Sequence, residues 1–242
     1  MNKFSYWFRK FILSKATDTQ PKPYFDDKAF RVFCISIQRT GTTSVGKFFR
    51  DFGFSWAGWP QSARNNWPFL HYEGNYEKIF GSDDFRKANA FEDSPWWYPG
   101  FYRVLYHRFP NSKFVLFTRD PDSWFRSMIK HSGGNVLGQP IVHCKNYRRE
   151  TEYFQLLSQG KISFEESIRF NGDKVMKMFG LDRHYKEIYQ LHTTEVIDFF
   201  RRNNPEALFV GSLDDADKWI KLGHFLGLNV PPNYISHENA SQ

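Results

Sequence analysis

A short stretch near residue 40 carries side chains that can bind a phosphate or a sulfate group. It holds one arginine, one glycine and four hydroxyl side chains, in the order Gln38, Arg39, Thr40, Gly41, Thr42, Thr43 and Ser44. The mostly apolar residues 32–36 suit a buried strand, and apolar residues recur after the stretch at helical spacing. The stretch therefore begins a helix, where unpaired N–H groups and the helix dipole attract anions.

Two simpler explanations of this stretch have to be considered. Thr42 or Thr43 could merely cap the helix, as hydroxyl side chains often do. A Walker loop needs two glycines that frame four residues, followed by Lys and then Ser or Thr. The stretch does not fit that pattern, so the cap is the alternative that stays open.

Two neighbouring carboxylates, Glu92 and Asp93, follow a predicted short strand at residues 88–91. A carboxylate at the carboxyl end of such a strand faces the crevice in which open α/β sheets bind their ligands. There it could take a proton from a substrate. The alternative is a solvated pair that caps the next helix.

A second basic turn follows the apolar run at residues 113–118, which we interpret as a buried strand. Arg119 stands at the end of this run, and Pro121 can begin a helix because its missing N–H would be unpaired there. Ser127 comes eight residues after Arg119 and could join it on one phosphate. The alternative is a surface Arg-Asp pair with a helix cap.

The two basic turns together resemble the nucleotide-binding elements of PAPS-dependent sulfotransferases. In that family the first loop grips the 5′-phosphosulfate, which here implies Thr40, Gly41, Thr42, Thr43 and Ser44 together with Arg39. Arg39 takes the place usually held by Lys, and would also offset charge that develops on the bridging oxygen. The second element implies that Arg119 and Ser127 hold the 3′-phosphate. The resemblance covers residues 31–54, 88–130 and 205–239.

The same resemblance leaves two candidates for the catalytic base. Glu92 matches a Phe-Glu-Lys-Ser-Pro pattern in which the glutamate is the base, although Asp93 departs from its lysine. Asp93 matches a second pattern, in which an acidic residue or a histidine two positions before Pro95 serves. The choice between the two carboxylates stays open.

The resemblance implies an α/β fold of three layers, P-loop-like, with a central and mainly parallel sheet flanked by helices. We expect one domain at residues 25–242, preceded by an amphipathic basic segment and linker at residues 1–24. The implied reaction moves a sulfuryl group from PAPS to the hydroxyl or amine of a small molecule or carbohydrate, leaving PAP. No metal site is expected, because the histidines and cysteines lack metal-ligand spacing.

Two other functions fit parts of the sequence. A small-molecule kinase would also cradle phosphate, but it should use ATP and Mg²⁺, and the Walker lysine is missing. A non-catalytic nucleotide-binding module would need the two basic turns and no base. Binding of PAP and of ATP separates the kinase from the other two, and sulfuryl transfer separates the enzyme from the module.

Residues 55–75 are predicted to form a loop, in which Trp56, Trp59 and Trp67 could build a sugar-stacking wall or plug a domain edge. Residues 135–177 should alternate polar loop with short helices and carry the choice of acceptor. Cys34 is expected in a buried strand and Cys144 in a polar loop. Two such cysteines give no disulfide framework, which favours a reducing compartment.

The net charge of +7 suits an anionic ligand, a nucleic acid or an anionic membrane. We expect no nucleic-acid partner. Residues 1–15 form an amphipathic basic helix by pattern, which could lie on a membrane surface or pack on its own domain. They lack the pattern of a signal peptide. The expected location is therefore cytoplasmic, with peripheral membrane contact as an option, and the oligomeric state is open.

Overall fold

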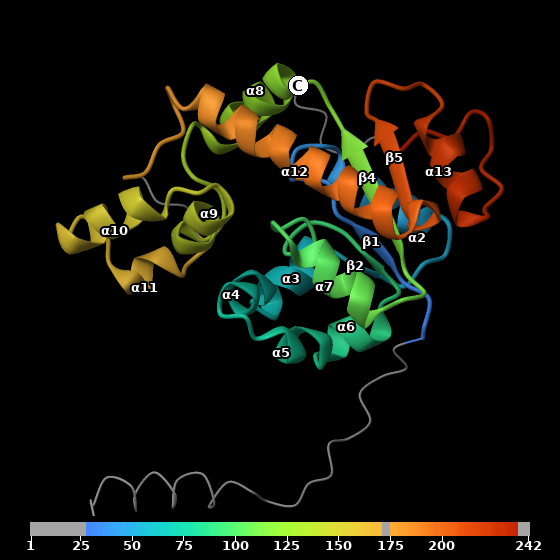
Figure 1. Cartoon of the computed structure of the whole chain (residues 1–242), viewed down its shortest axis with the longest axis horizontal. Coiled ribbons are helices and arrows are strands. Elements are labelled where there is room, and N and C mark those ends of the chain that lie inside the picture. The colour runs from blue at the N-terminus through green and yellow to red at the C-terminus, as the bar shows by residue number, and fades with distance from the viewer. Residues whose placement is uncertain (1–27, 171–174, 237–242) are drawn as a thin grey trace, which may run out of the picture.

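A computed structural model describes residues 28–170 and 175–236. Five strands form one all-parallel sheet in the order β2-β3-β1-β4-β5, with helices on both faces (Figure 1). The strands are β1 Val32–Cys34, β2 Trp56–Ala57, β3 Ala90–Phe91, β4 Lys113–Thr118 and β5 Leu208–Ser212. This confirms the predicted α/β class. The predicted helix at residues 1–15 lies outside the described residues.

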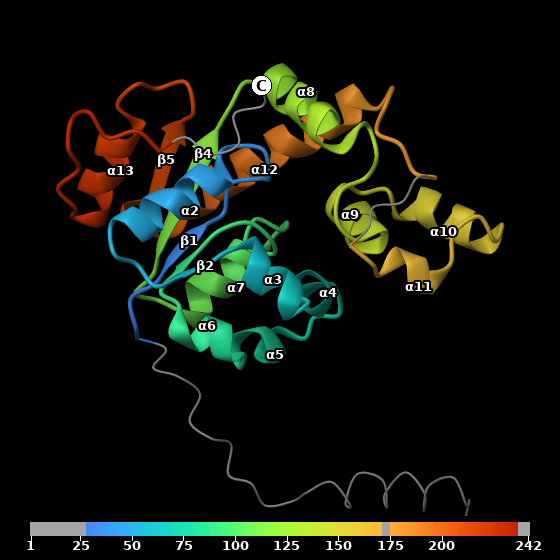
Figure 2. The same cartoon turned by 180° about the vertical axis from the view of Figure 1, so that it is seen from behind.

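Side chains of β1 alternate between two apolar clusters, one on each face of the sheet. Val32 and Cys34 join the smaller cluster, which is covered by α2 (Thr42–Asp51) and α13 (Lys218–Leu226) (Figure 2). Phe33 points to the larger cluster, which is covered by α7 (Phe101–Arg108) and α12 (Asp182–Asn203). This alternation follows from the two-residue period of a strand and makes the three-layer arrangement.

Residues 55–75 fold into short helices, so the predicted loop is wrong. Helices α3 (Trp59–Arg64) and α4 (Trp67–Tyr72) are followed by α5 (Tyr76–Phe80) and α6 (Asp83–Lys87). Each of the first two carries a proline in its first turn, where a missing N–H costs nothing. Helices of five or six residues are too short to show a helical period in the sequence.

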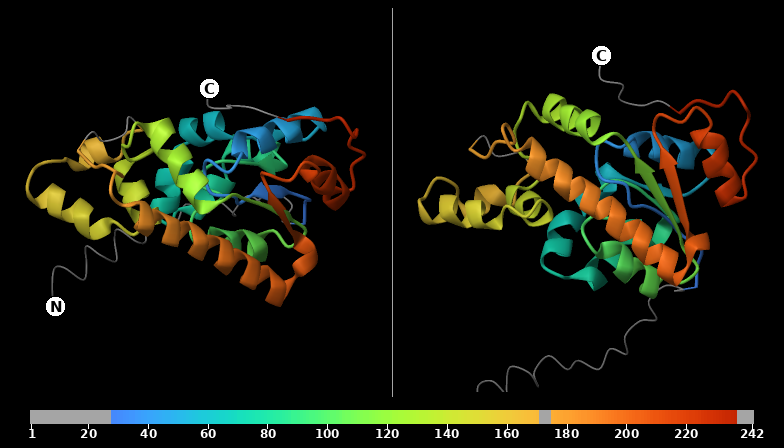
Figure 3. Two further views of the ribbon diagram at one scale, coloured as in Figure 1. Left: turned by 90° about the horizontal axis from the view of Figure 1, so that it is seen from above. Right: turned by 45° about the horizontal axis from the view of Figure 1, so that its top comes forward.

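The predicted mixture of loop and short helices at residues 135–177 is confirmed. Helices α9 (Pro140–Asn146), α10 (Glu150–Ser158) and α11 (Phe164–Ser167) project away from the sheet (Figure 3). Gln139 ties this part to α4, because its Nε2 donates to Asn66 Oδ1 over 2.9 Å. Cys144 is buried within α9, so its predicted place in a polar loop is wrong.

The strand order brings the two predicted anchors and the carboxylate pair to one edge of the sheet. Strand β1 lies between β3 and β4, and Phe33 is in register with Phe91 on one side and with Phe114 on the other. Because all the strands are parallel, the turns that follow β1, β3 and β4 emerge at the same edge. The third of these turns leads into α8 (Pro121–Ser132).

Candidate active site

The turn between β1 and α2 has a conformation that requires its glycine. Gly41 has φ 79°, and a Cβ atom there would lie 2.7 Å from the side chain of Leu213. Thr40 is fully buried and its hydroxyl donates to the carbonyl of Ile37, so its side chain shapes the turn from inside. The first turn of α2 carries no acidic residue and no side-chain cap. The positive end of the α2 dipole is thus not offset by a neighbouring carboxylate of the helix.

The two basic turns meet at this edge. Arg39 Nε donates to Ser127 Oγ over 3.2 Å, which joins the turn after β1 to α8. Burial lowers the pKa of Arg39, and the charge of Arg119 lowers it further. Two guanidinium groups that feel each other's charge repel unless an anion lies near them. The region therefore suits a ligand with more than one negative charge.

A stacked aromatic pair holds both turns. The hydroxyl of Tyr189, on α12, accepts from the N–H of Arg119 over 2.8 Å and donates to its carbonyl over 3.0 Å. The ring of Trp124 stacks on Tyr189 with centroids 4.6 Å apart, and its Nε1 donates to the carbonyl of Gln38 over 2.9 Å. The sequence analysis missed Tyr189, because its helical spacing indicates packing and nothing more.

Removing the Tyr189 hydroxyl is predicted to weaken PAP binding about 5- to 10-fold, the worth of one or two hydrogen bonds. Tyr189→Phe keeps the stack on Trp124 but frees the backbone of Arg119. Calorimetric titration with PAP measures the change. The matched control is Tyr153→Phe, which removes a buried hydroxyl that is 2.9 Å from Ser167 in another part of the fold. Equal losses in both variants would contradict a specific role for Tyr189.

Asp93 lies at the carboxyl end of β3 with φ 68°, and its carboxylate accepts from the N–H and the hydroxyl of Ser94 over 2.6 and 3.0 Å. It is partly exposed and lines a cavity together with Arg39 and His131. Burial raises the pKa of Asp93, while the bonds from Ser94 and the charges of His131 and Arg39 partly oppose that shift. A raised pKa makes the ionised carboxylate a stronger base.

Glu92 lies deeper, with 3% of its surface exposed. Its side chain fills a slot between α2 and the start of α3, since a Cβ on Gly58 would lie 2.2 Å from its Oε1 and one on Gly46 would lie 3.0 Å from its Cγ. Burial, and then the charge of Asp93, raise the pKa of Glu92 well above the usual value. Both effects favour the neutral acid over the carboxylate.

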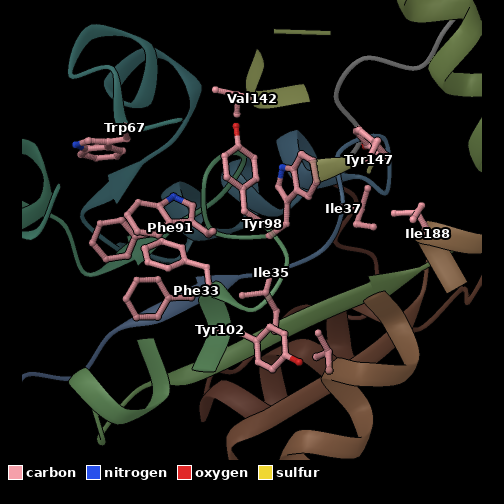
Figure 4. Close-up of a cluster of buried hydrophobic side chains, with 14 of the residues drawn as sticks. Phe33, Ile35, Ile37, Trp67, Phe91, Tyr98, Tyr102, Val142, Tyr147 and Ile188 are labelled. Carbon is pink, nitrogen blue, oxygen red and sulfur yellow. The ribbon is translucent and has the colours of Figure 1, made fainter. Parts of the chain in front are cut away.

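The cavity has a volume of about 520 Å³, which is within the range of pockets for small molecules. At one end it is lined by Arg39, Thr42 and Thr43, and Glu92 and Asp93 line it further in. Of the three tryptophans that could build a wall, Trp56 and Trp59 line it, whereas Trp67 is buried in the core. Figure 4 shows this floor, with the Tyr98 hydroxyl directed toward Val142.

The remaining predicted site residues lie next to this cavity. Arg119 and Ser127 border its basic end, through their closeness to Arg39. Ser44 is buried, and its carbonyl accepts from the hydroxyl of Ser236 over 2.6 Å. Within residues 28–170 and 175–236, no three His, Cys, Asp or Glu side chains cluster to hold a metal ion. No helix in those ranges is long and apolar enough to cross a membrane.

Comparison with known families agrees with this geometry. A family model described as a sulfotransferase domain matches residues 31–242. The chain belongs to the sulfotransferase family. Membership makes it a PAPS-dependent transferase, as the resemblance implies.

Similarity to individual proteins is weaker. No curated protein matches this sulfotransferase. A crystal structure of a sulfotransferase from Alicyclobacillus acidocaldarius is similar at 16% sequence identity, with 88% of this chain and 86% of that chain covered and a TM-score of 0.46. The donor-binding and catalytic residues of this sulfotransferase therefore have to be argued from its own geometry.

Proposed function

We propose that this sulfotransferase moves a sulfuryl group from PAPS to an acceptor hydroxyl or amine, with Asp93 as the general base. The observation that carries this proposal is the place of Asp93, a partly exposed carboxylate in the same cavity wall as Arg39. Glu92 is the alternative base, but its burial between α2 and α3 and its raised pKa disfavour the ionised form. The acceptor is a small molecule or a carbohydrate.

The donor would lie along the basic edge. The N–H groups at the start of α2, with Thr42, Thr43 and Arg39, would hold the 5′-phosphosulfate, as the uncapped N-terminus of this ten-residue helix allows. Arg119 and Ser127 would hold the 3′-phosphate. Arg39 is placed to offset negative charge that develops on the bridging oxygen as its bond to sulfur breaks.

Asp93 would act on the acceptor. Its carboxylate takes the proton of the acceptor hydroxyl while the new oxygen–sulfur bond forms, and the electrons of the broken bond go to the phosphate of the departing PAP. Ser94 fixes the carboxylate by two hydrogen bonds, which leaves Oδ2 for the acceptor. Transfer to a positioned base contributes about 10²–10⁴-fold in rate.

The rate should depend on pH through Asp93. Below its pKa the carboxyl group is protonated and cannot accept a proton, so kcat/KM falls as the pH drops through that value. Since burial raises the pKa of Asp93, the acid limb is predicted to lie above the value of about 3.9 that is usual for aspartate. Steady-state rates across the acidic range measure it. An identical acid limb in Asp93→Asn would contradict the assignment.

Calorimetry with PAP and with ATP plus Mg²⁺ tests the proposal against a kinase, and transfer of labelled sulfate from PAPS tests it against a non-catalytic module. We expect PAP to bind and ATP to bind more weakly, with label passing to an acceptor. Preferential binding of ATP with Mg²⁺ would favour the kinase. PAP binding without transfer to any acceptor would favour the module.

A further inference from the structure

The cavity has a second half, beyond Asp93, that differs in character from the basic end. We call this half the distal wall and define it by Trp59, Trp97, Gln139, His143, Asn146 and Phe170. It comes from α3, from the segment after β3, and from α9 to α11, which project from the sheet (Figure 3). An acceptor whose reacting group meets Asp93 would place the rest of its body against this wall.

None of the described residues of the distal wall carries a formal charge. The titratable one is His143, whose pKa burial lowers to about 3, with help from the charge of Arg149. Its Nε2 lies 2.7 Å from the hydroxyl of Tyr185. His143 is therefore neutral at physiological pH. The nearest charged lining groups are Arg50 and Glu92, and Arg50 is stacked over the ring of Trp56 at 4.5 Å.

Rings and amide groups supply the contacts of the distal wall. Trp59 and Phe170 meet edge to face, with centroids 5.2 Å apart. Gln139 and Asn146 are 2% and 5% exposed, so both amides are held in place by the fold. Gln139 donates to Asn66 and to the carbonyl of Ile168, while its Oε1 has no partner among the described residues. Aromatic rings with positioned amides suit a ring that bears hydroxyl groups.

We propose that the distal wall selects an uncharged, ring-bearing polyol, such as a simple glycoside, over acceptors that carry a carboxylate, a phosphate or an ammonium group. This inference rests on the proposed function, because it assigns the acceptor of that same site. The physical reason is desolvation: a charged group that loses water against a neutral wall finds no counter-charge there. A hydroxyl group instead exchanges its bonds to water for bonds to amides.

A matched pair of acceptors tests the proposal. 4-Nitrophenyl β-glucoside and the corresponding β-glucuronide share one ring and one aglycone and differ by a carboxylate. With labelled PAPS, kcat/KM for the glucuronide is expected to be at least about 100-fold lower, the range for an uncompensated charge. A 4-nitrophenyl glycoside of glucosamine, which carries an ammonium group, should be disfavoured in the same direction.

Two variants place the selection in the distal wall. Leu137, a partly exposed lining residue, is replaced in Leu137→Lys, which is expected to reduce the preference for the glucoside about 10-fold or more by adding a counter-charge. Trp59→Ala should raise the KM for the glucoside several-fold and leave PAP affinity unchanged, because Trp59 is 39% exposed and far from the core.

The outcomes separate this inference from the proposed function. PAP affinity is measured in parallel, and loss of PAP binding by the unmodified chain would overturn the proposed function itself. If PAP binds and the glucuronide or the glucosaminide is used as well as the glucoside, the neutral-acceptor inference is wrong while the donor site stands. The inference is also overturned if the PAP-saturated protein neither sulfates nor binds the glucoside in calorimetry.

Discussion

Asp93→Asn is expected to lower kcat by about 10²–10⁴-fold, whereas Glu92→Gln should lower it less than about 10-fold. Asparagine keeps the size of Asp93 and can still accept a hydrogen bond from Ser94, but it cannot take the acceptor's proton. Glutamine is close in shape to the protonated form of Glu92, which the raised pKa favours in its buried slot. The two substitutions are chemically equal, so they compare position alone.

Single-turnover transfer of labelled sulfate measures the chemical step, and calorimetry with PAP shows whether the donor site is intact. Both variants should bind PAP like the unmodified chain. The reverse ranking, with Glu92→Gln inactive and Asp93→Asn active, would make Glu92 the base. Full activity in the double variant would remove both carboxylates from the mechanism.

Arg39→Met is expected to lower kcat by about 10²–10³-fold, because it removes a cation from the place where charge develops on the bridging oxygen. Arg39→Lys should recover most of that loss, since it restores the charge while giving up the fixed guanidinium geometry that now contacts Ser127. Methionine retains the length of the side chain and fills the same partly buried space.

Arg126→Met is the matched control for Arg39→Met. Arg126 lies on the exposed side of α8, where its guanidinium donates to Ser123 over 2.8 Å. Both variants lose one positive charge from the same region, but only Arg39 lines the cavity. Steady-state kinetics with saturating PAPS separate the two effects. Equal losses would mean that net charge, and not the placed cation, determines the rate.

Much of the fold and of the donor site can be predicted from the sequence because short-range signals mark them. The apolar runs before Arg39 and Arg119 are long enough to read as buried strands, and β1 and β4 occupy them. The glycine in the first turn and Pro121 in the second mark where helices begin, as α2 and α8 do. Parallel strand order then brings both turns to one edge without further information.

Features that depend on contacts between distant residues could not be predicted. Nothing local separates Glu92 from Asp93, because their difference arises from the glycines at 46 and 58 that pack against Glu92. The role of Tyr189 depends on a turn 70 residues earlier in the chain. The short helices α3 and α4 lack a visible period, since Trp67 is buried by its neighbours and not by its own helical face.

The central claim is that two basic turns hold opposite phosphates of one nucleotide, and a calorimetric double-mutant cycle tests it most directly. PAP and 5′-AMP, which lacks the 3′-phosphate, are titrated into the unmodified chain and into Arg119→Ala. We predict that PAP binds the unmodified chain at least about 10-fold more tightly than 5′-AMP, and that Arg119→Ala removes most of this difference. Equal affinity of the unmodified chain for PAP and 5′-AMP would contradict the account.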